Sequence, residues 1–144
     1  VIIVRYEGPA ATGMPEQFYV TEAIASNPLL ATSTVLITDG RFSGATRGPA
    51  IGHVSPEAAH GGPIALVENG DRIRVDLAAK SLGIIGTLRD GRPVDLSPED
   101  VEALLTERKS RFAPPPPRYT SGLLGLYTRC AAPASEGAGL LASR

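Results

Sequence analysis

An apolar run that ends abruptly in a glycine-rich stretch is the strongest constraint on the fold of this 144-residue chain. The run covers residues 35–37, and residues 38–49 then concentrate glycines, hydroxyls and charges. Such a change is typical of a β-strand that feeds a binding loop, because glycine permits positive φ angles and close backbone approach to a ligand. An ordinary glycine-rich turn is the simpler alternative, and short glycine patterns alone do not separate the two. The sequence therefore predicts a strand followed by a candidate site loop.

The composition argues against several classes of function. The formal net charge is −1 and no basic stripe is present, so neither nucleic acid nor an anionic membrane is an expected partner. The apolar runs are strand-sized, which predicts no membrane-spanning helix and no secretory signal, and a cytoplasmic location is expected. Cys130 is the only cysteine. An internal disulfide or an iron–sulfur cluster held by this chain is therefore excluded.

Most periodic segments predict short β-strands. Polar and apolar side chains alternate over residues 72–77, which indicates a sheet with one buried and one solvated face. The Asn-Gly pair at residues 69–70 predicts a hairpin turn before this strand, and residues 89–92 predict a second turn. Strands are expected over residues 1–6, 34–38, 51–54, 64–67, 72–77 and 81–87.

Two helices and a proline-rich segment complete the expected order. Pro15 suits the first position of a helix or turn-rich segment that ends near Ala25. Ser97 is expected to cap a second helix, with Pro98 at its first position and acidic residues in its first turn. Residues 113–117 predict a stiff polyproline spacer rather than a Pro-rich ligand. Periodicity alone thus predicts an α+β or α/β domain with a compact, barrel-like sheet.

Several motifs along the chain occur in an order that resembles one family, the C-terminal domain of the dihydroxy-acid and sugar-acid dehydratases. The match is nearly continuous over about the first 80 residues and returns at the tail, and several ordered motifs are far more specific than one. The motifs are Val4–Pro9, Gly13–Glu16, Thr38–Gly48, Gly52–Ala58, Gly61–Ala65, Pro114–Arg118, Leu123–Tyr127 and Ala134–Ala138.

The resemblance implies an α/β fold of the swivelling β/β/α type, with a compact mixed sheet and a few helices. Residues 1–112 are expected to form this domain, and residues 113–144 a proline-rich segment and tail that pack on it. The chain begins with Val1 inside a strand-like run, so we expect it to be a piece of a longer protein.

The implied activity is an α,β-elimination that converts a 2,3-dihydroxy acid to a 2-keto acid, as in valine and isoleucine biosynthesis. The implied cofactors are Mg²⁺ and an iron–sulfur cluster that acts as Lewis acid on the departing C3 hydroxyl. The cluster ligands would belong to an N-terminal domain, the expected partner of this chain in a homodimeric enzyme. We therefore expect the isolated chain to be inactive.

Ser43 is the residue that the resemblance makes the catalytic base, removing the C2 proton of the substrate. A serine is a poor base until its alkoxide is stabilised, so metal charge and backbone donors are required. The N–H groups of Gly44, Ala45 and Thr46 are the candidate donors and substrate-binding groups. The alternative is a turn hydroxyl that bonds to its own backbone.

Glu16 is implied by the resemblance to be a ligand of the Mg²⁺ ion, which prefers oxygen donors. Its alternative role is that of a first-turn acid that favours the dipole of the following helix. Arg41 and Arg47 are candidates for binding the substrate carboxylate, because the guanidinium fork matches that group. For Arg41 an ion pair with Asp39 is the simpler explanation.

Three other functions remain open on the sequence alone. A sugar-acid dehydratase domain and the swivelling domain of aconitase-like isomerases are related enzyme alternatives, although the motif order favours the first family. A catalytically inert module that docks through an apolar face or binds small anions is the alternative from a different class.

Overall fold

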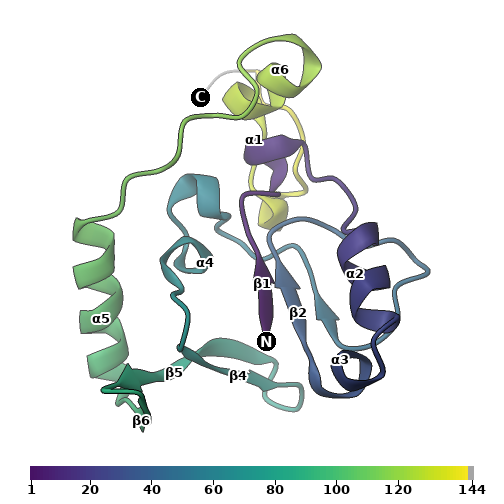
Figure 1. Ribbon diagram of the computed structural model, residues 1–144. Coiled ribbons are helices and arrows are strands. Elements are labelled where there is room, and N and C mark those ends of the chain that lie inside the picture. Colours follow the sequence, from purple (N-terminus) through teal and green to yellow (C-terminus); the bar gives the residue numbers. More distant parts are fainter. Residues whose placement is uncertain (143–144) are drawn as a thin grey trace. The chain divides into compact units, whose positions relative to one another are not determined.

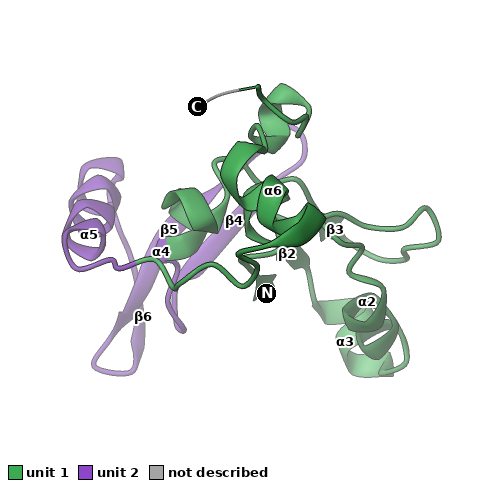
Figure 2. Ribbon diagram, turned by 90° about the horizontal axis from the view of Figure 1, so that it is seen from above, with its two compact units in different colours: residues 1–65, 114–144 green, residues 66–113 purple. Residues whose placement is uncertain are grey.

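The computed structural model describes residues 1–142, which form two compact units. Among these residues, unit 1 is built from residues 1–65 and 114–142, and unit 2 from residues 66–113 (Figure 2). Each unit holds a small three-stranded sheet, and the described residues form no closed barrel. The mixed α/β class is confirmed, whereas the expected single barrel-like sheet is not. The assignment of residues 1–112 and 113–144 to a domain and its tail stays a prediction.

Unit 1 contains a parallel sheet with β2 at its centre (Figure 1). Ile37 of β2 lies opposite Ile3 on one side and Ile51 on the other. All three residues of β2 are buried, so the predicted strand before the site loop is confirmed. The strands are β1 (Ile2–Val4), β2 (Leu36–Thr38) and β3 (Ala50–Ile51).

Short helices surround this sheet. In Figure 1, α2 and α3 lie beside β2 and β3. The helix α1 packs against α6, so closely that a Cβ added to Gly13, at the end of α1, would lie 2.9 Å from the Leu124 side chain. Every helix within residues 1–142 is too short or too polar to cross a membrane. The helical elements are α1 (Pro9–Thr12), α2 (Phe18–Ala25), α3 (Pro28–Ser33), α4 (Pro63–Leu66) and α6 (Gly122–Cys130), with 3-10 turns η1 (Ala58–His60) and η2 (Ala134–Glu136).

Unit 2 is an antiparallel meander of β4 (Arg72–Asp76), β5 (Ser81–Arg89) and β6 (Arg92–Asp95), followed by α5 (Pro98–Ser110). Asp90 and Gly91 form the two-residue hairpin loop with φ angles of 51° and 72°, as a type I′ turn requires. The Ser97 hydroxyl accepts a hydrogen bond from the Asp100 N–H at 3.1 Å. The predicted second turn and helix cap are therefore confirmed.

A buried ion pair joins α5 to the turn that precedes β4. Arg108, only 5% exposed, donates to both carboxylate oxygens of Asp71 and to the Leu66 carbonyl. Burial by itself raises the pKa of Asp71, but hydrogen bonds from Arg108, the Glu68 N–H and Thr87 outweigh it, so the pKa of Asp71 is lowered. Arg108, which also lies 3.3 Å from a Glu68 carboxylate oxygen, thus joins α5 to the segment before β4.

Four expectations about local structure were wrong. The strand expected over residues 51–54 is limited to β3, which ends at Ile51. Residues 64–67 are not a strand, because Pro63–Leu66 forms the helical turn α4; a four-residue apolar run fits either structure. The Asn69-Gly70 turn therefore links α4 to β4 and not two strands of a hairpin. Pro15 does not begin a helix, since α2 starts at Phe18.

Candidate active site

The carboxyl ends of β1 and β2 meet at Asp39, whose carboxylate is completely buried. One oxygen accepts the backbone N–H of Glu7 at 2.9 Å, and the other accepts those of Tyr6 and Ala58 at 3.1 and 2.9 Å. Within residues 1–142 this carboxylate is therefore bound by backbone donors, and the proposed ion pair with Arg41 does not form. Ligand sites of open α/β sheets gather at this edge, beyond the carboxyl ends of the strands.

Ser43 lies in a tight turn within the loop that connects β2 to β3. Its Oγ accepts the Ala45 N–H at 3.1 Å, and its carbonyl oxygen accepts the Thr46 N–H at 3.1 Å. The Ser43 residue is half-buried, whereas Gly44 and Ala45 are exposed. Among the predicted backbone donors, the Ala45 N–H donates to the Ser43 hydroxyl and the Thr46 N–H donates to the Ser43 carbonyl oxygen. This geometry suits a turn hydroxyl, and it equally gives a serine oxyanion one fixed donor.

The segment of Glu16 pairs with the segment of Arg41. The two residues form an isolated parallel bridge, in which the Gln17 N–H donates to the Arg41 carbonyl at 2.9 Å. The Glu16 side chain is exposed and makes no hydrogen bond or ion pair to residues 1–142. Glu16 precedes the N-cap of α2, Gln17, so the alternative role as a first-turn acid is wrong. The fold thus brings the predicted metal ligand alongside the predicted site loop.

Glycines in this loop have different functions. Of its glycines Gly40, Gly44 and Gly48, only Gly48, with φ of 83°, adopts the left-handed conformation that glycine permits. Gly40 is required for close approach instead, because a Cβ there would lie 3.1 Å from the Gln17 side chain and from Glu7. Gly44 has no atom within 4 Å of its Cβ position. The loop is therefore tightly packed where it leaves β2 and open around Ser43.

Arg41 and Arg47 lie at opposite ends of the loop. Arg41 follows the carboxyl end of β2, beside Glu16. Arg47 lines a 200 Å³ pocket with Leu36 and Ala50, the first residues of β2 and β3. Both arginines are exposed, and neither forms an ion pair within the described part of the chain. Only Arg41 is brought close to the Glu16 segment by the backbone.

A second buried carboxylate, Glu57, was missed by sequence reasoning. It is 1% exposed, and its two oxygens accept the Ala10 N–H at 3.0 and 3.2 Å. A Cβ on Gly8 would lie 1.8 Å from one of these oxygens. The Gly8-Pro9 pair is the one local signal, since it indicates a close approach at the start of α1.

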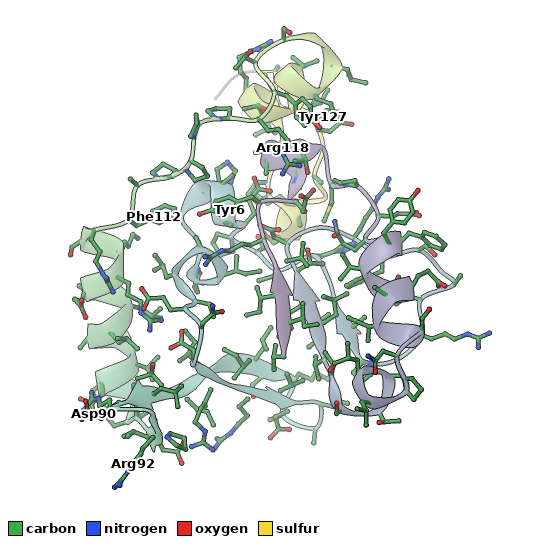
Figure 3. All side chains as sticks on the ribbon, in the orientation of Figure 1. Tyr6, Asp90, Arg92, Phe112, Arg118 and Tyr127 are labelled. Atoms are coloured by element: carbon green, nitrogen blue, oxygen red, sulfur yellow. The ribbon has the colours of Figure 1, made fainter. Side chains whose placement is uncertain are left out.

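A cluster at the end of β1 ties the C-terminal tail to the same edge of the sheet. The Glu7 carboxylate accepts the Thr12 hydroxyl at 3.1 Å and Arg118 Nη1 at 3.4 Å. Figure 3 shows Arg118 near Tyr6, and both line a pocket of 590 Å³. The Glu7 carboxylate, for which the sequence predicted no role, therefore has two side-chain partners within unit 1.

The donor set fits one ligand of a Mg²⁺ ion and not a complete site. No group of three or more His, Cys, Asp or Glu side chains converges among residues 1–142. The exposed Glu16 carboxylate is a hard oxygen donor of the kind that Mg²⁺ prefers. An iron–sulfur cluster does not fit, because it needs several thiolates and Cys130 is the only cysteine.

The segments that carry Glu16, Arg41 and Ser43 thus lie beyond the carboxyl end of β2, the edge at which open α/β sheets bind small molecules. The family model described as dihydroxy-acid/6-phosphogluconate dehydratase C-terminal matches residues 1–138. The chain belongs to this family, as the motifs predicted.

Curated relatives carry the name dihydroxy-acid dehydratase. Those of Saccharolobus islandicus (strain M.14.25 / Kamchatka #1) and Saccharolobus solfataricus are each 48% identical to this chain over 139 residues. That of Pyrobaculum aerophilum is 49% identical over 139 residues. Each alignment covers 96% of this chain and 22% of the relative, so the chain spans about a fifth of the length of these proteins.

Proposed function

We propose that this chain supplies the serine base and one Mg²⁺ ligand to a dehydratase that converts 2,3-dihydroxy acids to 2-keto acids, as in valine and isoleucine biosynthesis. The pairing of Glu16 with Arg41 carries the proposal, because it holds a carboxylate beside the Ser43 loop. The relatives' shared name supports dihydroxy acids over 6-phosphogluconate, which the family description also includes.

The remaining parts of the site would come from the rest of a full-length protein. The relatives are several times longer than this chain, which leaves ample sequence for a cluster-binding N-terminal domain. In this proposal the chain is a swivelling β/β/α-type domain in a cytoplasmic homodimer. The single cysteine means that the iron–sulfur cluster, if present, is held entirely outside this chain.

The reaction requires one proton to leave C2 and one hydroxyl to leave C3. The Ser43 oxygen takes the C2 proton, the C–H electron pair forms the C2–C3 double bond, and the C3–O bond breaks. The hydroxyl departs as water after it takes up a proton, and the enol tautomerises to the 2-keto acid. The Ala45 N–H stabilises the serine oxyanion at 3.1 Å, and Arg41 holds the substrate carboxylate. Mg²⁺, when bound, draws electron density from the substrate oxygens.

Ser43→Ala in the full-length enzyme tests the assignment of the base. Turnover of 2,3-dihydroxy-3-methylbutanoate should fall by roughly 10² to 10⁴ in kcat, with KM little changed, because proton removal belongs to the transition state. Stability should change by less than about 1 kcal/mol, since the hydroxyl bonds only to its own turn.

Ser121→Ala is the matched control, because Ser121 precedes α6 and its side chain makes no capping hydrogen bond. This variant should keep wild-type kcat. If Ser43→Ala also keeps wild-type kcat, Ser43 is a turn residue and the base is a different group.

Glu16→Gln in the full-length enzyme tests the metal ligand. The Mg²⁺ concentration for half-maximal activity should rise and kcat should fall together, because an amide is a weaker ligand than a carboxylate. The fold should be unaffected, since the Glu16 side chain is exposed. Glu22→Gln, an exposed acid on α2, is the control. A metal titration identical for both variants would remove Glu16 from the site.

A further inference from the structure

Asp39 joins three separate segments of unit 1. Its carboxylate accepts two N–H groups from the end of β1 and one from η1, although it belongs to the end of β2. No part of the side chain is exposed to solvent. A buried carboxylate without its hydrogen bonds is strongly disfavoured, so these three segments are held in one arrangement.

The backbone at Tyr6 is shaped to fit this carboxylate. Tyr6 has a φ of 65°, a conformation that non-glycine residues rarely adopt. The turn directs the consecutive N–H groups of Tyr6 and Glu7 to the two oxygens of Asp39, as in the anion-binding nests formed by successive amides. The unusual backbone of β1's end is therefore coupled to the start of the site loop.

The residues that follow Asp39 transmit this arrangement to the site. At Gly40 the backbone is so close to Glu7 and Gln17 that a Cβ would lie 3.1 Å from each. The next residue, Arg41, accepts the Gln17 N–H and forms the bridge with Glu16. A displacement of Asp39 would therefore move the Ser43 loop relative to the Glu16 segment.

We propose that Asp39 is a positioning residue, which sets the place of Ser43 relative to Glu16 by fixing the end of β2 against the end of β1. The proposal rests on the proposed function of these two residues. Asp39 is buried, and within residues 1–142 its hydrogen-bond donors are all backbone N–H groups. It therefore acts through the loop and not on the substrate.

Asp39→Asn in the full-length enzyme tests the proposal. The amide keeps the size of the side chain but turns an NH₂ toward an N–H donor, which loosens the junction. We expect kcat for 2,3-dihydroxy-3-methylbutanoate to fall about 10²-fold, the effect of a displacement of about 1 Å at a reacting group. The Mg²⁺ concentration for half-maximal activity should also rise, because Glu16 moves relative to Ser43.

Glu57→Gln is the matched control, since Glu57 is equally buried but binds the Ala10 N–H of α1. Assayed well below the unfolding temperature, it should keep kcat within about threefold while losing stability as Asp39→Asn does. Equal kcat values for the two variants would make Asp39 a structural residue only.

Gly40→Ala provides a second test if Asp39→Asn does not fold. Its Cβ would push on Glu7 and Gln17 at the same junction while leaving the Asp39 carboxylate intact. A loss of about tenfold in kcat supports the proposal, and wild-type kcat overturns it. Ser43→Ala, assayed alongside, separates the two questions: full activity of that variant rejects the proposed base, whatever the Asp39 result.

Discussion

Units 1 and 2 bury carboxylates in different ways. In unit 1, Asp39 and Glu57 accept hydrogen bonds from backbone N–H groups of loops and of α1, and His60 Nδ1 lies 3.9 Å from Glu57 Oε1. In unit 2, Asp71 is bound mainly by the guanidinium of Arg108. A backbone donor cannot be supplied without bending the chain, whereas an arginine reaches a carboxylate from a distant, regular helix.

The difference indicates that the buried carboxylates have different roles in the two units. Backbone-bound carboxylates shape the irregular loops at the carboxyl edge of the parallel sheet, where Ser43 and Glu16 are found. The side-chain pair of unit 2 instead joins α5 to the turn before β4. We expect damage to the pair to affect stability alone, and three variants test this contrast.

The largest effect on stability is expected for Arg108→Met, which leaves Asp71 buried without its cation. Removal of one partner of a buried ion pair costs about 3–5 kcal/mol. Urea unfolding of this chain, with hydrogen exchange to resolve the two units, should show the loss in unit 2. Arg111→Met is the control, because Arg111 is exposed and pairs with exposed acids. An equal, small loss for both arginines would break the comparison.

A smaller effect is expected for Gly8→Ala in unit 1. The new Cβ would lie 1.8 Å from the Glu57 carboxylate and 2.8 Å from its Cβ, so the buried side chain must move. Overpacking of this kind costs about 1–3 kcal/mol. Gly44→Ala meets no atom within 4 Å and should change stability by less than about 0.5 kcal/mol. Thermal unfolding of both variants checks the difference.

The smallest effect is an acid dependence of unit 2. The pKa of Asp71 is lowered in the folded chain, so its stabilising contribution is present above its unfolded pKa of about 3.9. The contribution is lost as the pH falls through the lower, folded value. The stability difference between the wild type and Asp71→Asn should therefore be constant near pH 6 and shrink below about pH 4. A difference independent of pH from 6 to 2 would contradict the assignment.

Local signals predicted the parts of the fold that depend on neighbouring residues. The Asp90-Gly91 turn and the Ser97 cap each follow from one short motif, and both are confirmed. The run at residues 64–67 was misassigned because a short apolar segment fits a strand and a helical turn equally well. The separation into two sheets has no local signal, since it depends on pairing between distant segments.

The candidate site shows the same limit. Motifs identified the segments that carry Glu16 and Ser43. The pairing of these two segments depends on a single backbone bridge between Glu16 and Arg41, which no periodicity in the sequence predicts. The buried carboxylates were missed for a related reason. Asp39 and Glu57 look like ordinary loop acids in the sequence, because the hydrogen bonds from Glu7 and Ala10 come from backbone N–H groups, which every residue type except proline carries.

Unit 1 is discontinuous in the chain, because the 48 residues of unit 2, numbers 66–113, separate its two parts. The α1–α6 packing and the Glu7–Arg118 contact join positions more than 100 residues apart. Contacts of such long sequence separation form slowly, whereas the meander of unit 2 is local. During synthesis, unit 2 can therefore fold before α6, the packing partner of α1 in unit 1, has been made. The packing of α1, which begins after the end of β1, is therefore completed only when α6 is available.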